Sequence, residues 1–174
     1  MIRPANSGAE TPGRGLAVVE ARNGVAVAVL NLLGQLFLPT PVSPWELVDA
    51  LVDEARAAAP VVVLDFHAEA TSEKVALATW LDGRVTAVIG THTHVQTNDA
   101  RILAGGTAAV SDAGMTGPHD SVIGVRSELA IARMRSPLPV KFEPAEAGVR
   151  LEGVLVTCTD GGRAEAIELV RVPA

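Results

Sequence analysis

The chain has 174 residues, of which 48% are hydrophobic and 20% are charged, a composition typical of a soluble globular protein and not of a disordered one. The formal net charge is −6, and no basic run is present, which argues against a DNA duplex as partner. A small phosphorylated ligand is compatible with this charge, because bound metal ions can supply positive charge.

One cysteine, Cys158, excludes a disulfide scaffold within the chain. No apolar run is long enough to cross a bilayer, and the first residues contain no apolar segment of a secretory signal. We therefore expect a single domain over residues 1–174, located in the reducing cytoplasm and without a membrane partner.

The first elements in chain order form a hairpin. Residues 1–15 are rich in Gly and Pro and predict an ordered loop. Apolar runs over 16–20 and 25–31 flank the pair Asn23-Gly24, which is the strongest short signal for a β-hairpin. The second run is apolar throughout its first six positions, which predicts a strand covered on both faces.

A helix is expected next, over residues 45–59. Ser43 is its predicted N-cap, and Pro44 suits its first position. Its predicted buried stripe consists of Leu47, Leu51 and Ala55.

The next predicted elements are a strand over 61–65, a helix over 72–81 and a strand over 85–89. Thr71 or Ser72 is the predicted cap of this helix, and Glu73 complements its dipole. Strand, helix and strand with short loops make a βαβ unit, and such units build parallel sheets. The last third predicts short antiparallel strands separated by Gly-rich turns, over 107–112, 140–144, 151–159 and 164–172. The expected fold class is α/β, with a sheet flanked by helices and antiparallel strands near the C-terminus.

Three of the four histidines follow predicted strands. His67 follows the strand over 61–65, and His92 and His94 follow the strand over 85–89. Ligands of parallel sheets bind beyond the carboxyl ends of the strands. Residues i and i+2 of an extended segment point to the same side, so we expect the side chains of His92 and His94 to leave the strand together.

Three imidazoles at one sheet edge predict a metal site, because neutral ring nitrogens are good ligands for zinc, iron and manganese. A metal with an open position would activate a water as nucleophile. The alternative is that His92 and His94 are ordinary loop residues and that His67 is a hydrogen-bonded core residue.

The acidic residues near these histidines are candidates for supporting roles. Asp65 precedes His67 by two positions and would orient its imidazole. Glu69 and Asp112 are also close to the predicted strand ends, although Asp at a strand end is equally common as a loop or cap residue.

Other reactive side chains are weaker candidates. His119 lies in a loop and is expected to be exposed. Ser72 and Ser121 lack a nucleophile elbow, and Cys158 lies within a predicted strand without an activating environment. No catalytic nucleophile or acid is therefore assigned.

Several strings resemble one family closely. Gly90-Thr-His-Thr-His94 resembles the last histidine motif of calcineurin-like metallophosphoesterases. More specifically, six segments of this chain resemble sequence motifs of the bacterial YmdB-like phosphodiesterases. These segments are Asp65-Phe-His-Ala-Glu-Ala-Thr-Ser-Glu-Lys74, Leu81-Asp-Gly-Arg84, Gly90 to Thr97, Gly114-Met-Thr-Gly-Pro118, Arg3-Pro-Ala-Asn6 and Thr11-Pro-Gly-Arg-Gly15.

The resemblance implies a metallophosphoesterase sandwich with two metal ions, iron or manganese, that hydrolyses phosphodiesters such as 2′,3′-cyclic nucleotides. By motif, His67 and His92 would bind one metal and His94 the other. Asp65 and Asp112 remain candidates for supporting these ligands because of their positions near the histidines, and not because of the family motif.

The sequence also departs from the family pattern. The family's Gly-Asp strand, Glu-Asn pair and Asn-His pair, which supply further ligands and the proton donor, have no counterpart here. Smaller departures are His119 in place of an aromatic residue and residues 7–10 in place of a Pro-rich turn. We therefore expect the C-terminal portion of a longer enzyme or a truncated remnant.

Such a chain would bind at most one metal ion and have little or no diesterase activity. It would also expose apolar surface, which favours self-association into a homo-oligomer. Two alternatives remain open, a non-catalytic interaction module and a mononuclear metal hydrolase.

Overall fold

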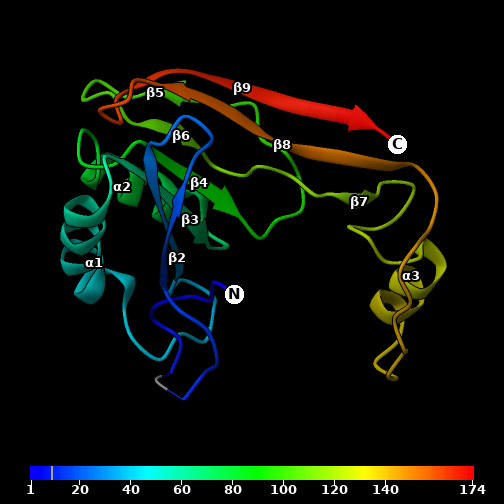
Figure 1. Cartoon of the computed structure of the whole chain (residues 1–174). Helices are drawn as coiled ribbons and strands as arrows, with labels where there is room; N and C mark the ends of the chain where they lie inside the picture. Colours follow the sequence, from blue (N-terminus) through cyan, green and yellow to red (C-terminus); the bar gives the residue numbers. More distant parts are fainter. Residues whose placement is uncertain (9) are drawn as a thin grey trace.

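The computed structural model describes residues 1–8 and 10–174, and Figure 1 shows its course. In the described residues the helices are α1 (Pro44–Ala58), α2 (Thr71–Trp80) and α3 (Ser127–Arg135). The strands are β1 (Leu16–Glu20), β2 (Ala26–Leu33), β3 (Val61–His67), β4 (Ala87–Thr91), β5 (Arg101–Ile102), β6 (Ala108–Val110), β7 (Gly117–Pro118), β8 (Val149–Cys158) and β9 (Ala164–Pro173).

The larger sheet has the strand order β1-β2-β3-β4-β6-β5. Its four central strands, β2, β3, β4 and β6, are parallel, and the edge strands β1 and β5 are antiparallel to their neighbours. The predicted hairpin and the predicted βαβ unit are both confirmed. The parallel pairing of β3 with β4 brings the carboxyl ends of these two strands to the same edge.

Helices α1 and α2 cover one face of this sheet. Alternate residues of β2 and β3 pack against the apolar sides of both helices, and these core residues include Ala28, Leu30, Leu32, Val62, Leu64, Phe66, Val48, Val52, Leu77 and Leu81. Strand side chains alternate between faces, so every second residue of the central strands lies in this layer.

The long β8–β9 hairpin covers part of the other face, with β7 extending the smaller antiparallel sheet (Figure 1). Ala164 of this hairpin packs with Ala87 and Ala108 of the larger sheet. The hairpin does not bury this face of β2, where Val27 and Val29 are only half-buried. The prediction that this strand is covered on both faces is therefore wrong.

Helix α1 confirms its predicted start. The Ser43 side chain accepts a hydrogen bond from the backbone N–H of Trp45, and Pro44 is the first helical residue. The predicted stripe is right for Ala55, which is buried, but Val48 and Val52 are the buried residues in place of Leu47 and Leu51, which are half-buried.

The N-terminus of α2 differs from the prediction. Ala70 occupies the cap position, and neither Thr71 nor Ser72 provides a capping hydrogen bond. Glu73 is buried, and its carboxylate accepts hydrogen bonds from the backbone N–H groups of Gln35 and Leu36. This carboxylate therefore joins the loop after β2 to the first turn of α2.

The region between β7 and β8 also differs from the prediction. Residues 140–144 form no strand and contribute one isolated bridge, between Pro144 and Val125. Residues 127–135 form α3 instead, which projects from the sheets in Figure 1 and buries only Ala130. A helix with little apolar contact shows a weak periodic signal in sequence.

Apolar side chains lie exposed on β1 and on the outer side of the β8–β9 hairpin, among them Val18, Val19, Leu151, Leu155 and Val172. Among the described helices, none combines the length and the hydropathy needed to cross a bilayer.

Candidate metal centre

Two of the three predicted histidines, His67 and His92, meet at the carboxyl ends of the strands of the larger sheet. His67 is the last residue of β3 and pairs in register with Thr91, the last residue of β4. His92 follows directly. Its Nδ1 lies 2.9 Å from Nε2 of His67, and the two rings meet edge to face with their centroids 4.8 Å apart.

The loop after β4 is not extended, contrary to the prediction. His92 has a φ of 112° and His94 a φ of 65°, in the region that non-glycine residues seldom adopt. As a result the two side chains diverge. His92 contacts His67, whereas Nδ1 of His94 lies 3.0 Å from the carbonyl oxygen of Ile123.

All three histidines nevertheless line one open cavity of about 680 Å³. Its remaining walls are largely apolar and come from the loop after β6, the turn before α3 and the loop before β8, with Met115, Ile123, Val125, Phe142 and Pro144 as lining residues. The cavity therefore presents imidazole nitrogens on one side and apolar surface on the other.

Asp65 acts on His67 through Thr91. The Thr91 hydroxyl donates to Oδ1 of Asp65 at 2.7 Å, and Asn31 donates to Oδ2 at 2.7 Å. A hydroxyl has one proton, so the Thr91 oxygen accepts from Nδ1–H of His67, 3.2 Å away. This tautomer leaves the lone pair of His67 on Nε2, which faces His92.

The carboxylate of Glu69 pairs with Nε2 of His92, the ring nitrogen that does not face His67. Its Oε2 lies 3.0 Å from Nε2 of His92, so Nε2–H donates to the carboxylate and Nδ1 faces His67. A carboxylate on the far nitrogen of a metal-binding histidine is the usual way to orient such a ligand.

Asp112 shapes the loop that carries His92 and His94. Its carboxylate accepts from the backbone N–H of Thr93 at 2.9 Å and from that of Gly114 at 3.0 Å. Lys74 of α2 balances its charge, with Nζ 3.0 Å from Oδ2. The sequence pattern of α2 does not indicate that Glu73 and Lys74 are buried, because charged residues in a first helical turn usually face solvent.

Gly90 allows β4 to approach the end of β6. A Cβ at this position would lie 1.8 Å from the carbonyl oxygen of Ser111. The glycine of the Gly90-Thr-His-Thr-His94 motif therefore brings the histidine loop against Asp112.

Burial lowers the pKa of His67, and the nearby His92 lowers it further. His67 is accordingly neutral at neutral pH, the form that binds metals.

The donor set of His67 and His92 suits a transition metal. Metal–nitrogen bonds measure about 2.0–2.1 Å, so two adjacent ligands at right angles have nitrogens about 2.9 Å apart, as Nε2 of His67 and Nδ1 of His92 do. In residues 1–8 and 10–174, however, no three His, Cys, Asp or Glu side chains are already gathered to hold an ion. His94 is the predicted ligand that does not join the other two.

The weaker candidates have structural contacts. His119 is half-buried and not exposed as predicted, since its Nε2 lies 3.0 Å from the carbonyl oxygen of Met115. The Ser121 hydroxyl donates to the carbonyl oxygen of Pro118 at 2.6 Å. Burial raises the pKa of the Cys158 thiol, as do Glu165 and Asp160, which keeps it protonated at neutral pH.

These features define an α/β protein with a histidine site at the carboxyl edge of a parallel sheet. The family model of the YmdB-like proteins matches residues 1–170, and the chain belongs to this family.

Known relatives agree with this assignment. The chain is 47% identical over 172 residues to the 2′,3′-cyclic-nucleotide 2′-phosphodiesterase of Bacillus subtilis (strain 168), covering 99% of this chain and 64% of that protein. A crystal structure of a hypothetical protein from Thermus thermophilus superposes with a TM-score of 0.91 at 39% identity, over 99% of this chain and 67% of that one. A novel phosphatase from Mycoplasma pneumoniae has a TM-score of 0.88 at 32% identity, over 99% and 63% respectively.

The predicted family and fold class are thus confirmed. The chain spans 64% of the length of the Bacillus subtilis relative.

Proposed function

We propose that the chain carries the histidine ligands of a metal-dependent phosphodiesterase centre, with 2′,3′-cyclic nucleotides as the substrate class. The observation that carries the proposal is the 2.9 Å approach of Nε2 of His67 to Nδ1 of His92 at the carboxyl edge of β3 and β4. The name of the Bacillus subtilis relative supports the reaction and the substrate.

In this proposal His67 and His92 bind one metal ion, and His94 binds a second, with iron or manganese as the metals. Such a pair of ions supplies an activated water and neutralises the oxygens of an in-line displacement at phosphorus. The chain's own residues orient the ligands. Thr91 fixes the tautomer of His67, and Glu69 fixes the ring of His92.

The cavity walls suit a phosphodiester that carries a nucleobase. The histidines face the charged group, while Met115, Ile123 and Phe142 offer apolar surface to a base. Phe142 is 51% exposed, so its ring is available for stacking.

The 174-residue chain by itself is expected to bind at most one metal ion. Two ions about 3.5–4 Å apart require a bridging group. The carboxylates of Asp65, Glu69 and Asp112 are occupied by Thr91, His92 and Lys74 respectively. We therefore expect weak or no hydrolysis by the isolated chain.

Metal binding provides the first test. Mn²⁺ is titrated into the purified chain by calorimetry, and we expect one site that His67→Ala or His92→Ala abolishes. His119→Ala is the matched control, because His119 contacts Met115 and does not line the cavity. Unchanged Mn²⁺ binding in both ligand variants would refute the proposal and favour a non-catalytic module.

Hydrolysis is tested in a chimera in which this chain replaces the matching part of the Bacillus subtilis relative. We expect turnover of 2′,3′-cyclic AMP with Mn²⁺ and a loss of at least about 100-fold in His94→Ala. Equal turnover by His94→Ala and its parent would refute the role given to His94. Full activity with one equivalent of zinc would instead indicate a mononuclear hydrolase.

A further inference from the structure

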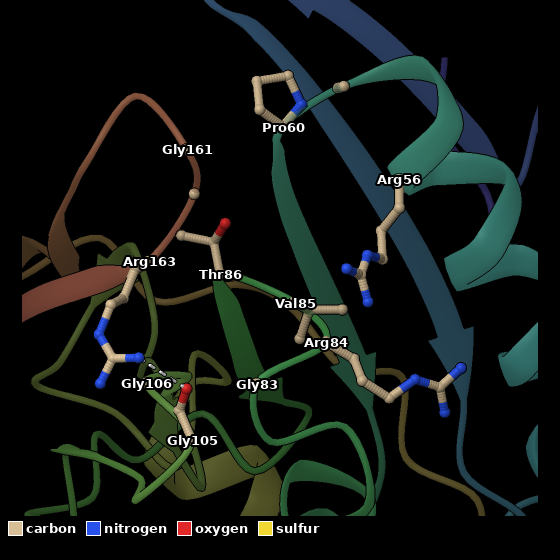
Figure 2. A pocket seen from close by; sticks show the side chains of 12 residues that line it. Arg56, Pro60, Gly83, Arg84, Val85, Thr86, Gly105, Gly106, Gly161 and Arg163 are labelled. Atoms are coloured by element: carbon tan, nitrogen blue, oxygen red, sulfur yellow. Dashed lines mark hydrogen bonds between the residues drawn. The ribbon is translucent and has the colours of Figure 1, made fainter.

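A second cavity lies at the amino ends of strands β3 and β4, whereas the histidines lie at the carboxyl ends of the same strands. It has a volume of about 250 Å³ and mainly polar walls. Pro60, which precedes β3, and Thr86, which precedes β4, both line it (Figure 2). His67 is the last of the seven residues of β3, so it lies roughly 20 Å from Pro60 at about 3.3 Å per residue.

Three arginines from different parts of the chain line this cavity. Figure 2 shows Arg56 extending from the last turn of α1 toward Val85 and Thr86, and Arg163 on the other side of the cavity. Arg84 comes from the segment before β4. Three guanidinium groups at one cavity are notable in a chain with a net charge of −6.

The three arginines differ in their partners. Arg84 is paired with the carboxylates of Asp49 and Asp53 on α1. Arg56 and Arg163, in contrast, make no ion pair with any carboxylate in the part of the chain that the structure describes. Within the described residues the side chain of Arg163 donates one hydrogen bond, from Nη1 to the carbonyl oxygen of Gly105 at 3.3 Å. Both residues are exposed, and a guanidinium has five N–H groups, so most of their side-chain donors face solvent without an acceptor among the described residues.

The guanidinium group of Arg163 packs directly against the backbone of Gly106. Gly106 has a φ of +99°, and a Cβ there would lie 2.9 Å from Nη1 and Cζ of Arg163. The guanidinium therefore rests against bare backbone at the cavity wall. Packing, and not an ionic partner, positions this charge, which leaves it available to a ligand.

We propose that this cavity binds a small dianion of the phosphate type, either inorganic phosphate or a phosphate monoester, between Arg56 and Arg163. Guanidinium groups bind phosphate oxygens through paired, charge-assisted hydrogen bonds. The ion pairs of Arg84 neutralise its own charge and leave the other two guanidinium groups to balance the dianion. The site does not depend on the metal centre.

Calorimetric titration of the metal-free, full 174-residue chain tests the proposal. Sodium phosphate and glycerol 3-phosphate are the two probes, at constant ionic strength maintained with chloride. We expect one site, and about tenfold weaker binding in each of Arg56→Gln and Arg163→Gln. Tighter binding of the ester than of the free ion would identify a monoester as the ligand, and the reverse would identify inorganic phosphate.

Two controls separate this site from other anion contacts. Arg133→Gln removes an exposed arginine of α3 whose side chain, within the described residues, donates only to the carbonyl oxygen of Ser136, and this variant should bind phosphate like the parent. The double variant His67→Ala/His94→Ala should also bind like the parent. The proposal is overturned if the parent does not bind either probe at millimolar concentration, if the two arginine variants bind normally, or if the histidine variant loses binding. Circular dichroism of each variant verifies folding.

Discussion

Lys74 and Asp112 form a buried ion pair directly beneath the loop that carries His92 and His94. Their side chains are 4% and 1% exposed, with Nζ 3.0 Å from Oδ2. The same carboxylate binds the backbone N–H of Thr93, between the two histidines. The pair thus connects helix α2 to the conformation of the metal-binding loop.

Removing one partner of this pair leaves a buried charge without compensation. We expect Lys74→Met to lower the free energy of unfolding by about 3–5 kcal/mol, measured by urea denaturation. The double variant Lys74→Met/Asp112→Asn should recover part of this loss, because the Asn oxygen still accepts from Thr93. Additive losses in the double variant would show that the two charges do not depend on each other.

Gly90 is expected to be irreplaceable for a steric reason. Gly90→Ala places a methyl group 1.8 Å from the carbonyl oxygen of Ser111, which must displace backbone and should cost about 3 kcal/mol or more. Gly153→Ala in β8 is the matched control, because nothing lies within 4 Å of its Cβ position. That variant should be neutral or more stable by about 0.5–1 kcal/mol. Thermal unfolding of both variants provides the comparison, and similar melting temperatures would contradict the steric argument.

Thr91 is expected to be a positioning residue for the metal site. Thr91→Val retains the shape of the side chain but removes the hydroxyl that joins Asp65 to Nδ1 of His67. We expect about 10- to 100-fold weaker Mn²⁺ binding by calorimetry. Thr91→Ser preserves the hydroxyl and should restore most of the affinity, which a purely steric role for Thr91 would not explain.

The sequence predicted the parallel sheet and the location of the histidines because these follow from local patterns. The strand ends at His67 and Thr91 are set by short apolar runs, and the parallel pairing follows from the helix between them. The positive φ values of His92 and His94 could not be predicted from the neighbouring residues in the sequence. They accompany contacts of Thr93 with Asp112 and of His94 with Ile123, which lie 19 and 29 residues further along the chain.

The same limit applies to buried charge. Glu73 and Lys74 occupy a helix start, where solvent exposure is the ordinary expectation. Their burial depends on backbone N–H groups after β2 and on a carboxylate after β6. No spacing rule relates these segments, so only the folded arrangement shows that both charges have partners.

Asp99 provides a prediction of pH dependence. Burial acts to raise its pKa, but hydrogen bonds from Ser111 and Thr97 outweigh burial and lower the pKa to about 2. The folded pKa lies below the ordinary value of 3.8, so Asp99 stabilises the fold above about pH 4. This contribution declines as the pH falls through about 2.

Asp99→Asn tests this contribution, because Asn mimics the protonated acid. At neutral pH we expect the variant to be less stable by about 1–2 kcal/mol, a value reduced for a side chain that is partly open to solvent. Urea denaturation at several pH values should show the difference between parent and variant narrowing from about pH 4 toward about pH 2. A difference that stays constant across this window would mean that the Asp99 carboxylate gains nothing from its ionised form.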